Sequence, residues 1–183
     1  IAFDWVAGDH DETDAALTAA ADNGFEIFDI DVINNRVIIN SMETRPIVAE
    51  PDPEDGTLNI WCGTQGPVGI AKQLTTALGL SKGGVRVRTG DVGGGFGFKI
   101  FLHPEQLIVA WAARKLGTRL RWQQNRSDGF LSDLHGRDNR TKARAVVDAD
   151  GKVHALHVTV HANMGSWLSN FSTCIPTLSG SRT

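Results

Sequence analysis

The sequence lacks several features that would indicate a function directly. It has no apolar run near the roughly 18 residues of a membrane-spanning helix, so we expect no membrane segment. It has two cysteines, Cys62 and Cys174, which lie far apart and have no metal-ligating partners at a useful spacing. This scarcity favours a reducing, cytoplasmic location and leaves a single disulfide open.

Charge gives little support for a nucleic-acid partner, because the net charge is −3 and aromatic residues do not alternate with basic ones. The charge is unevenly placed along the chain. Residues 1–35 hold nine acidic residues and no Lys or Arg, whereas residues 114–144 hold nine basic residues and three Asp. Both segments are typical of solvated faces, and the basic one would also suit a phosphate group or a partner subunit.

Two common phosphate-binding motifs are absent from the glycine-rich stretch 91–99. A Walker A loop needs Gly before its Lys and Ser or Thr after it, but Lys99 lies between Phe98 and Ile100. The dinucleotide fingerprint needs a third Gly where Phe98 or Ile100 stands. A phosphate- or nucleotide-binding domain is therefore a weak candidate.

The segment 93–97 reads Gly-Gly-Gly-Phe-Gly. Bare backbone accepts positive φ angles and lets a ligand approach its N–H groups closely. Phe96 does not suit a flexible linker, because a large apolar ring needs something to pack against. We interpret this segment as a shaped loop that contacts a ligand; the alternative is a tight turn between packed elements.

The hydrophobic pattern alternates between strand and helix periods. Helices are expected over 67–78 and 104–116, with Leu74, Leu78, Ile108 and Trp111 packed on one sheet. Segments 140–148 and 152–163 alternate across Asp150-Gly151, which predicts a long hairpin. Further strands are expected at 26–31, 36–40, 45–50, 57–62, 85–88 and 118–124, and 126–139 as a polar loop. We predict an α+β fold: a mixed β-sheet with two helices packed on one face, followed by a long β-hairpin.

Residues 1–24 are rich in Asp and Ala and are expected to form an acidic linker or one short helix around 13–21. The chain begins at Ile1 instead of Met, and residues 181–183 follow without a closing element. We therefore expect a truncated end at 181–183 and a longer parent protein.

Two other motifs carry no predicted chemistry. Residues 79–83 read Gly-x-Ser-x-Gly, but a nucleophile elbow lies between a strand and a following helix, and here the order is reversed. His154, His157 and His161 would share one face of a helix, yet the β-branched residues around them favour a strand. We expect exposed strand histidines.

Gln65 is a stronger candidate. It follows the expected strand 57–62 and precedes the expected helix that begins at Pro67. Ligands favour such places because free N–H groups of the helix N-terminus point outward, and an amide side chain both donates and accepts. The alternative is a helix-capping residue.

Together these loops carry a resemblance. The sequence 64–67, Thr-Gln-Gly-Pro, followed by 90–99, Gly-Asp-Val-Gly-Gly-Gly-Phe-Gly-Phe-Lys, closely resembles the molybdopterin-binding large subunit of the xanthine dehydrogenase, aldehyde oxidase and carbon monoxide dehydrogenase family. The segment 42–45, Met-Glu-Thr-Arg, is similar to the strand entering that domain, and 140–167 to its long hairpin. The resemblance covers about 25–180, which it identifies as part of the first molybdopterin-binding domain.

The resemblance implies roles for individual residues. Gln65 would lie beside the molybdenum and orient a metal-bound oxygen. The other cofactor-binding residues would be Gly66, Gly94, Gly95, Phe96 and Gly97, with no direct protein ligand to the metal. Phe98 stands where many members have a small residue, and Thr44 where Pro is common.

The resemblance also implies a parent enzyme. It would oxidatively hydroxylate an aldehyde, an N-heterocycle or carbon monoxide, with oxygen from water and electrons passed to iron–sulfur and FAD-binding subunits or domains. The family's catalytic Glu, substrate loop and second molybdopterin-binding domain lie outside this sequence. We therefore expect the isolated chain to be inactive and to hold no molybdenum. The alternative is a non-catalytic interaction or assembly module that keeps the fold without cofactor.

Overall fold

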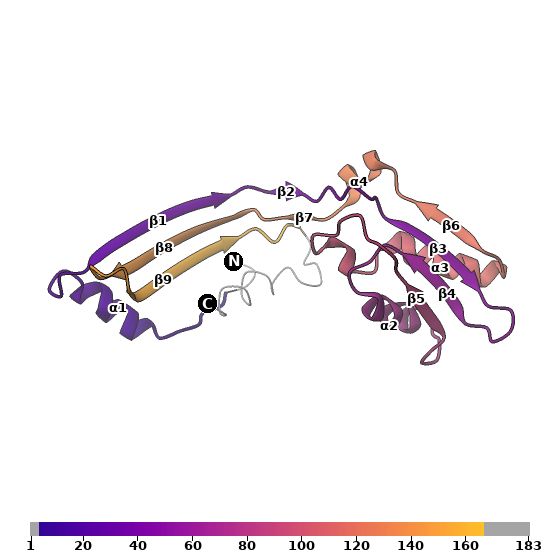
Figure 1. Cartoon of the computed structure of the whole chain (residues 1–183), viewed down its shortest axis with the longest axis horizontal. Coiled ribbons are helices and arrows are strands. Elements are labelled where there is room, and N and C mark those ends of the chain that lie inside the picture. The colour runs from indigo at the N-terminus through magenta and orange to yellow at the C-terminus, as the bar shows by residue number, and fades with distance from the viewer. Residues whose placement is uncertain (1–3, 167–183) are drawn as a thin grey trace. The chain divides into compact units, whose positions relative to one another are not determined.

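The computed structural model describes residues 4–166 and divides the chain into two compact units. One unit joins Ile1–Val37 to Gly136–Thr183, and the other is Ile38–His135. We call them the terminal unit and the central unit. Figure 1 labels their helices and strands. The two-residue strands β2 (Val37–Ile38) and β7 (His135–Gly136) pair where the chain passes from one unit to the other.

The terminal unit is a three-stranded sheet with one helix. Strands β1 (Glu26–Asn34), β8 (Asn139–Val147) and β9 (Val153–Ala162) pair antiparallel in the order β1-β8-β9. Helix α1 (His10–Ala19) begins where Asp9 accepts the N–H of Glu12 at 2.9 Å. It packs against β9 and β8 (Figure 1).

Helix α1 and the histidines of β9 correspond to two predictions made for the terminal unit. Residues 1–24 contain the short helix, although it begins earlier than the predicted 13–21. His154, His157 and His161 lie on a strand, as predicted, and only His157 is half-buried. The pairing of β1 with β8 was not predicted, because cross-strand pairing over a hundred residues leaves no local signal.

The central unit carries a four-stranded sheet in the order β5-β4-β3-β6. Its elements, in chain order, are β3 (Pro46–Pro51), β4 (Leu58–Cys62), α2 (Pro67–Ala77), β5 (Val85–Arg88), η1 (Phe98–Ile100), α3 (Pro104–Leu116), β6 (Leu120–Gln123) and α4 (Arg126–Ser132). β4 and β5 are parallel and joined through α2, and the other pairs are antiparallel. The α+β class is confirmed.

The core of the central unit joins one sheet face to α2 and α3. Alternate residues of β3 and β4 point into it together with Ile70 and Leu74 of α2. Its buried members are Ile47, Ala49, Leu58, Ile60, Cys62, Ile70, Leu74, Val85, Ala110 and Ala113. Both predicted helices exist, and Leu74 is buried while Leu78 is half-buried.

The predicted buried face of α3 was wrong. Ile108 is 61% exposed and Trp111 51% exposed. The buried residues are Gln106, Ala110 and Ala113, a neighbouring stripe on the same helix. Small side chains let the helix axis approach the sheet closely. The helix face with Ala110 and Ala113 therefore packs on the sheet, and the face with the larger Ile108 and Trp111 is turned to the solvent.

The expectation that 126–139 is a polar loop was also wrong, because α4 occupies residues 126–132. None of the helices within residues 4–166 combines the length and the apolar character needed to cross a membrane.

Candidate functional site

The two loops singled out in the sequence lie at one edge of the central sheet. β4 and β5 are parallel neighbours, so the segment after Cys62 and the segment after Arg88 leave the sheet at the same edge. Gln65 belongs to the first segment and the glycine loop, residues 93–97, to the second. The backbone N–H of Gly97 donates to Gln65 Oε1 at 3.0 Å, so the two loops touch.

The glycine loop is shaped by its backbone and by Gln65. Gly94 and Gly97 have φ angles of +95° and +83°, which side chains rarely adopt. A Cβ at Gly95 would overlap the carboxamide of Gln65. Phe96 also has a positive φ, +49°, and the residue is 73% exposed. Within the described residues most of Phe96 is therefore left uncovered, and the interpretation that this loop contacts a ligand stays a prediction.

Gln65 does not cap α2. The N-cap residue is Gly66, whose N–H donates to Thr64 Oγ1 at 3.1 Å, and no side chain caps the helix. The carboxamide of Gln65 is exposed, and within residues 4–166 its nitrogen donates to no acceptor. Its oxygen is held by Gly97, so the amide group has a fixed orientation and two free donors.

Glu43 and Lys99 lie directly beneath these loops. Lys99 Nζ donates to Glu43 Oε2 at 2.7 Å, and the same oxygen accepts the N–H of Gly93 at 3.1 Å. The side chain of Lys99 is 1% exposed and that of Glu43 is 32% exposed. The backbone carbonyl of Lys99 accepts from Gln65 N at 3.0 Å and from Thr64 Oγ1 at 2.7 Å.

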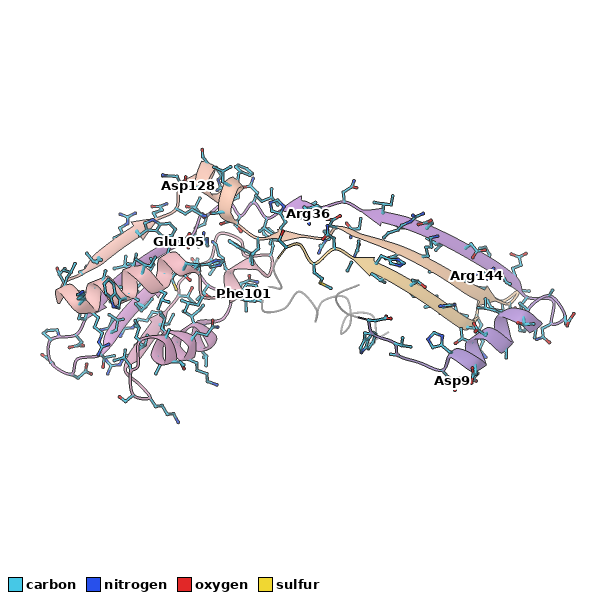
Figure 2. All side chains as sticks on the ribbon, turned by 180° about the vertical axis from the view of Figure 1, so that it is seen from behind. Asp9, Arg36, Phe101, Glu105, Asp128 and Arg144 are labelled. Atoms are coloured by element: carbon cyan, nitrogen blue, oxygen red, sulfur yellow. The ribbon has the colours of Figure 1, made fainter. Side chains whose placement is uncertain are left out.

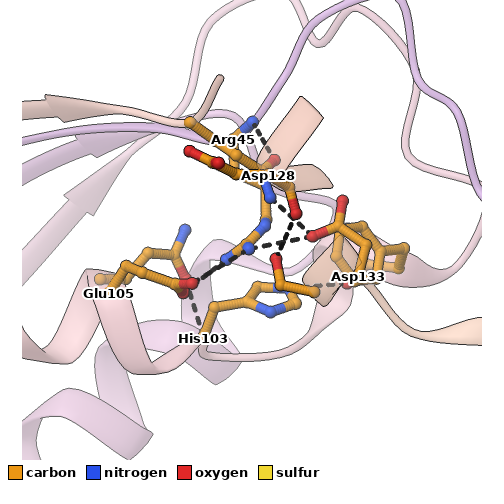
Figure 3. A network of polar contacts seen from close by, with 9 residues as sticks. Arg45, His103, Glu105, Asp128 and Asp133 are labelled. Atoms are coloured by element: carbon orange, nitrogen blue, oxygen red, sulfur yellow. Dashed lines mark hydrogen bonds and ion pairs between the residues drawn. The ribbon is translucent and has the colours of Figure 1, made fainter. Parts of the chain in front are cut away.

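A second network of polar contacts centres on Arg45 (Figure 3). The guanidinium pairs with Glu105 at 2.7 Å and with Asp133 at 3.0 Å, and its side chain is 3% exposed. It also lies over the rings of Phe98 and Trp122, at 5.4 and 5.7 Å from their centroids. The network therefore fixes Phe98, the residue that precedes Lys99.

Burial sets the protonation states in this network. It lowers the pKa of His103, with help from the charge of Arg45, so the imidazole is neutral at pH 7. His103 Nε2 lies 3.2 Å from the carbonyl of Phe98. Burial acts to raise the pKa of Glu105, but the hydrogen bonds and charge of Arg45 outweigh it and hold the pKa below its ordinary value.

Cys62 ends β4 below the same edge. Burial, reinforced by the charge of Glu43, raises the pKa of this thiol to about 11. A neutral, buried thiol is a poor nucleophile, so Cys62 is a packing residue. Cys174 lies outside the described residues.

Several of these residues were missed as site residues by sequence reasoning. Lys99 failed the Walker pattern and belonged, like Glu43 and Arg45, to the segments of the family resemblance, and none of the three was given a role in the site. Asp133 was placed in a polar loop. The available signal was a charged residue between apolar neighbours, as in Phe98-Lys99-Ile100, but that pattern does not identify the partner.

The geometry fits a ligand that presents oxygen acceptors to a close backbone. The glycine loop excludes side chains at Gly95 and exposes its backbone next to the free amide donors of Gln65. No group of three or more His, Cys, Asp or Glu within residues 4–166 could hold a metal ion. A large cofactor that carries its own metal ligands is compatible with such a site.

Comparisons with known proteins show the family to which the chain belongs. The family model described as the molybdopterin cofactor-binding domain matches residues 1–183. Subunit gamma of the 6-hydroxypseudooxynicotine dehydrogenase complex of Paenarthrobacter nicotinovorans is 32% identical over 141 residues, covering 74% of this chain and 18% of that protein. The carbon monoxide dehydrogenase large chain of Hydrogenophaga pseudoflava is 28% identical over 165 residues, covering 90% and 20%.

Solved structures give the same result. Quinoline 2-oxidoreductase from Pseudomonas putida 86 superposes with a TM-score of 0.67 at 32% identity, over 75% of this chain and 18% of that one. CO dehydrogenase from Oligotropha carboxidovorans superposes with a TM-score of 0.74 at 27% identity, over 86% and 19%. The chain thus spans about a fifth of the length of these relatives. The chain belongs to the molybdopterin cofactor-binding domain family.

Proposed function

We propose that this chain supplies part of the molybdopterin site in the large subunit of a molybdenum hydroxylase. Residues 25–180 would form part of the first molybdopterin-binding domain, with the central sheet, its two helices and the β8–β9 hairpin as its frame. The observation that carries the proposal is the contact between Gln65 and the glycine loop. It combines fixed amide donors with bare backbone at one sheet edge.

In this proposal the residues bind and orient. The free amide nitrogen of Gln65 donates to an oxygen of the cofactor, while its oxygen stays on Gly97 N–H. Gly66, Gly94, Gly95, Phe96 and Gly97 present their backbone to the cofactor face. When bound, a molybdenum–molybdopterin group supplies the two-electron oxidative hydroxylation itself.

The substrate of the complete subunit would be an aldehyde, an N-heterocycle or carbon monoxide. Relatives named for such substrates include nicotine 6-hydroxylase, CO dehydrogenase and aldehyde oxidase 4. The electrons would leave through iron–sulfur and FAD-binding partners, in the cytoplasm, and a second molybdopterin-binding domain would complete the site. The chain 1–183 alone would then hold no cofactor, since one side of a cleft buries too little of a ligand.

The first test is metal and pterin analysis of the complete subunit and of the chain 1–183. We expect stoichiometric molybdenum and molybdopterin in the complete subunit and neither in the isolated chain. A complete subunit that contains neither molybdenum nor molybdopterin would overturn the proposal and favour the alternative of a non-catalytic assembly module.

The second test is Gln65→Glu in the complete subunit. Glutamate keeps an oxygen for Gly97 N–H and removes the donors, so turnover should fall by about 100-fold with molybdopterin content unchanged. Gln73→Ala is the control, because Gln73 is an exposed glutamine on α2. Equal turnover in the Gln65→Glu and wild-type subunits would refute the role of Gln65.

A further inference from the structure

Gly63 and Gly93 show that space is reserved for the side chain of Glu43. A Cβ at Gly63 would lie 2.7 Å from Glu43 Oε2, and one at Gly93 would lie 2.5 Å from Glu43 Cβ. Neither glycine has a positive φ, so backbone conformation does not require glycine there. Gly63 lies just before Gln65, and Gly93 opens the glycine loop. The side chain of Glu43 therefore packs against the first residues of both loops, Gly63 and Gly93.

Glu43 and Lys99 then connect the two loops through a continuous path of contacts. Glu43 binds Gly93 twice, through Oε2 and through its own N–H, which donates to Gly93 O at 2.9 Å. Its carboxylate pairs with Lys99, and the carbonyl of Lys99 holds Thr64 and Gln65. A displacement of either loop would therefore distort the hydrogen bonds that hold the other loop.

Stability alone does not explain a charged pair at this place. Burying a lysine costs free energy that its partner repays only in part, and an apolar side chain of similar volume is often as stable. The side chain of Lys99 is 1% exposed, and within the described residues its Nζ has Glu43 as its single hydrogen-bond partner. An ion pair with a buried lysine and a partly exposed glutamate suits a role in fixing the arrangement of the segments that it joins.

We propose that Glu43 and Lys99 are positioning residues that hold Gln65 and the glycine loop in one fixed arrangement for the cofactor. The coupling of the loops stands on the contacts above, whereas its use for a cofactor rests on the proposed function. Neither side chain needs to touch the cofactor, since both act through Gly93, Gln65 and Thr64.

The coupling is tested by amide hydrogen exchange on the full chain 1–183. In Lys99→Met, we expect the amides of Gly93, Gly97 and Gln65 to exchange about tenfold faster or more, with β3 and α3 amides unchanged. Arg86→Met is the matched control. Arg86 lies on β5, the strand that leads into the glycine loop, and forms an exposed ion pair with Asp55. Exchange at the three amides within about twofold of wild type in Lys99→Met would overturn the proposal.

The double variant Glu43→Gln/Lys99→Met covers the case in which Lys99→Met fails to fold, because it leaves no unpaired charge at this place. The same faster amide exchange is expected in the double variant, and exchange at the wild-type rate would again overturn the coupling.

In the complete subunit, Lys99→Met should lower molybdopterin content about threefold or more. Unchanged content with faster exchange would refute the positioning role. A wild-type subunit without molybdopterin would refute the proposed function and leave the coupling intact.

Discussion

The terminal and central units each contain a β-sheet with a mostly antiparallel strand order, but they differ in what stabilises that sheet. Among residues 4–166, eleven of the thirteen buried hydrophobic residues lie in the central unit, and the terminal unit contributes Ala20 and Val146. The central sheet is therefore held by a core, whereas the terminal sheet depends on its hydrogen-bond ladder, its turns and exposed ion pairs. Arg144, labelled on β8 in Figure 2, donates to Asp29 across that sheet at 2.8 Å.

The terminal sheet also has an apolar face that no described element covers. Cross-strand register places Phe28, Ala145 and Leu156 in one row and Ile30, Ala143 and Val158 in the next. Phe28, Ile30, Leu156 and Val158 are 50%, 55%, 53% and 46% exposed. The same alternating pattern thus produces a core in one unit and, among residues 4–166, an exposed face in the other, because within these residues the apolar sheet face is covered by helices in the central unit alone.

The largest difference should appear when an ion pair is removed from each unit. Arg45→Met leaves two carboxylates without their buried partner and should cost about 3–5 kcal/mol of unfolding free energy. Arg144→Met removes an exposed pair and should cost less than about 1 kcal/mol. Urea denaturation followed by amide hydrogen exchange measures each cost in its own unit, with β3 amides reporting on Arg45→Met and β8 amides on Arg144→Met. Similar costs for both variants would contradict the comparison.

Truncating one apolar residue in each unit should give a somewhat smaller contrast. Leu74→Ala opens a cavity in the core and should cost about 3 kcal/mol, because Leu74 is fully buried. Val158→Ala changes a residue on the open face and should cost less than about 1 kcal/mol. Urea denaturation measures both losses of unfolding free energy, and amide exchange of β9 is the readout for Val158→Ala. A large loss in Val158→Ala would show that its face is covered in solution.

Alkaline pH should weaken the central unit through Cys62. The folded-state pKa, about 11, lies above the ordinary value of 9.0, so the neutral thiol's contribution is complete below pH 9 and is lost as pH rises toward 11. The full loss is about 2–3 kcal/mol. Measuring unfolding free energies from pH 8 to 11 for wild type and Cys62→Ala isolates this contribution from other titrations. Parallel pH profiles for the two proteins would rule it out.

The smallest effect should come from the hairpin turn of the terminal unit. Gly151 has a φ of +82°, so Gly151→Ala should cost about 1 kcal/mol. Gly136→Ala is the control, because Gly136 has no positive φ and open space around it. Exchange rates of β8 and β9 amides should rise only in Gly151→Ala. Faster exchange in the central unit as well would show that the two units unfold together.

Local patterns were enough to predict most individual elements. Pro67 and Gly79 bracket α2, and Pro104 and Gly117 bracket α3, because these residues start and stop helices by their own backbone chemistry. The failure on α3 has the opposite cause. Two neighbouring stripes were both compatible with the helical period, and the approach distance to the sheet selected the one with alanines.

The sequence by itself determined helices α2 and α3, most strands, the α+β class and the two loops that carry the family resemblance, since each depends on residues close together in the chain. Tertiary structure decided which charged residues meet. Glu43 reaches Lys99 across 56 positions, and Arg45 reaches Asp133 across 88. A buried charge is tolerated only beside its partner, and that partner is chosen by how the sheet and loops pack. The candidate site could therefore be located from the sequence, whereas the network that holds it became visible only in the fold.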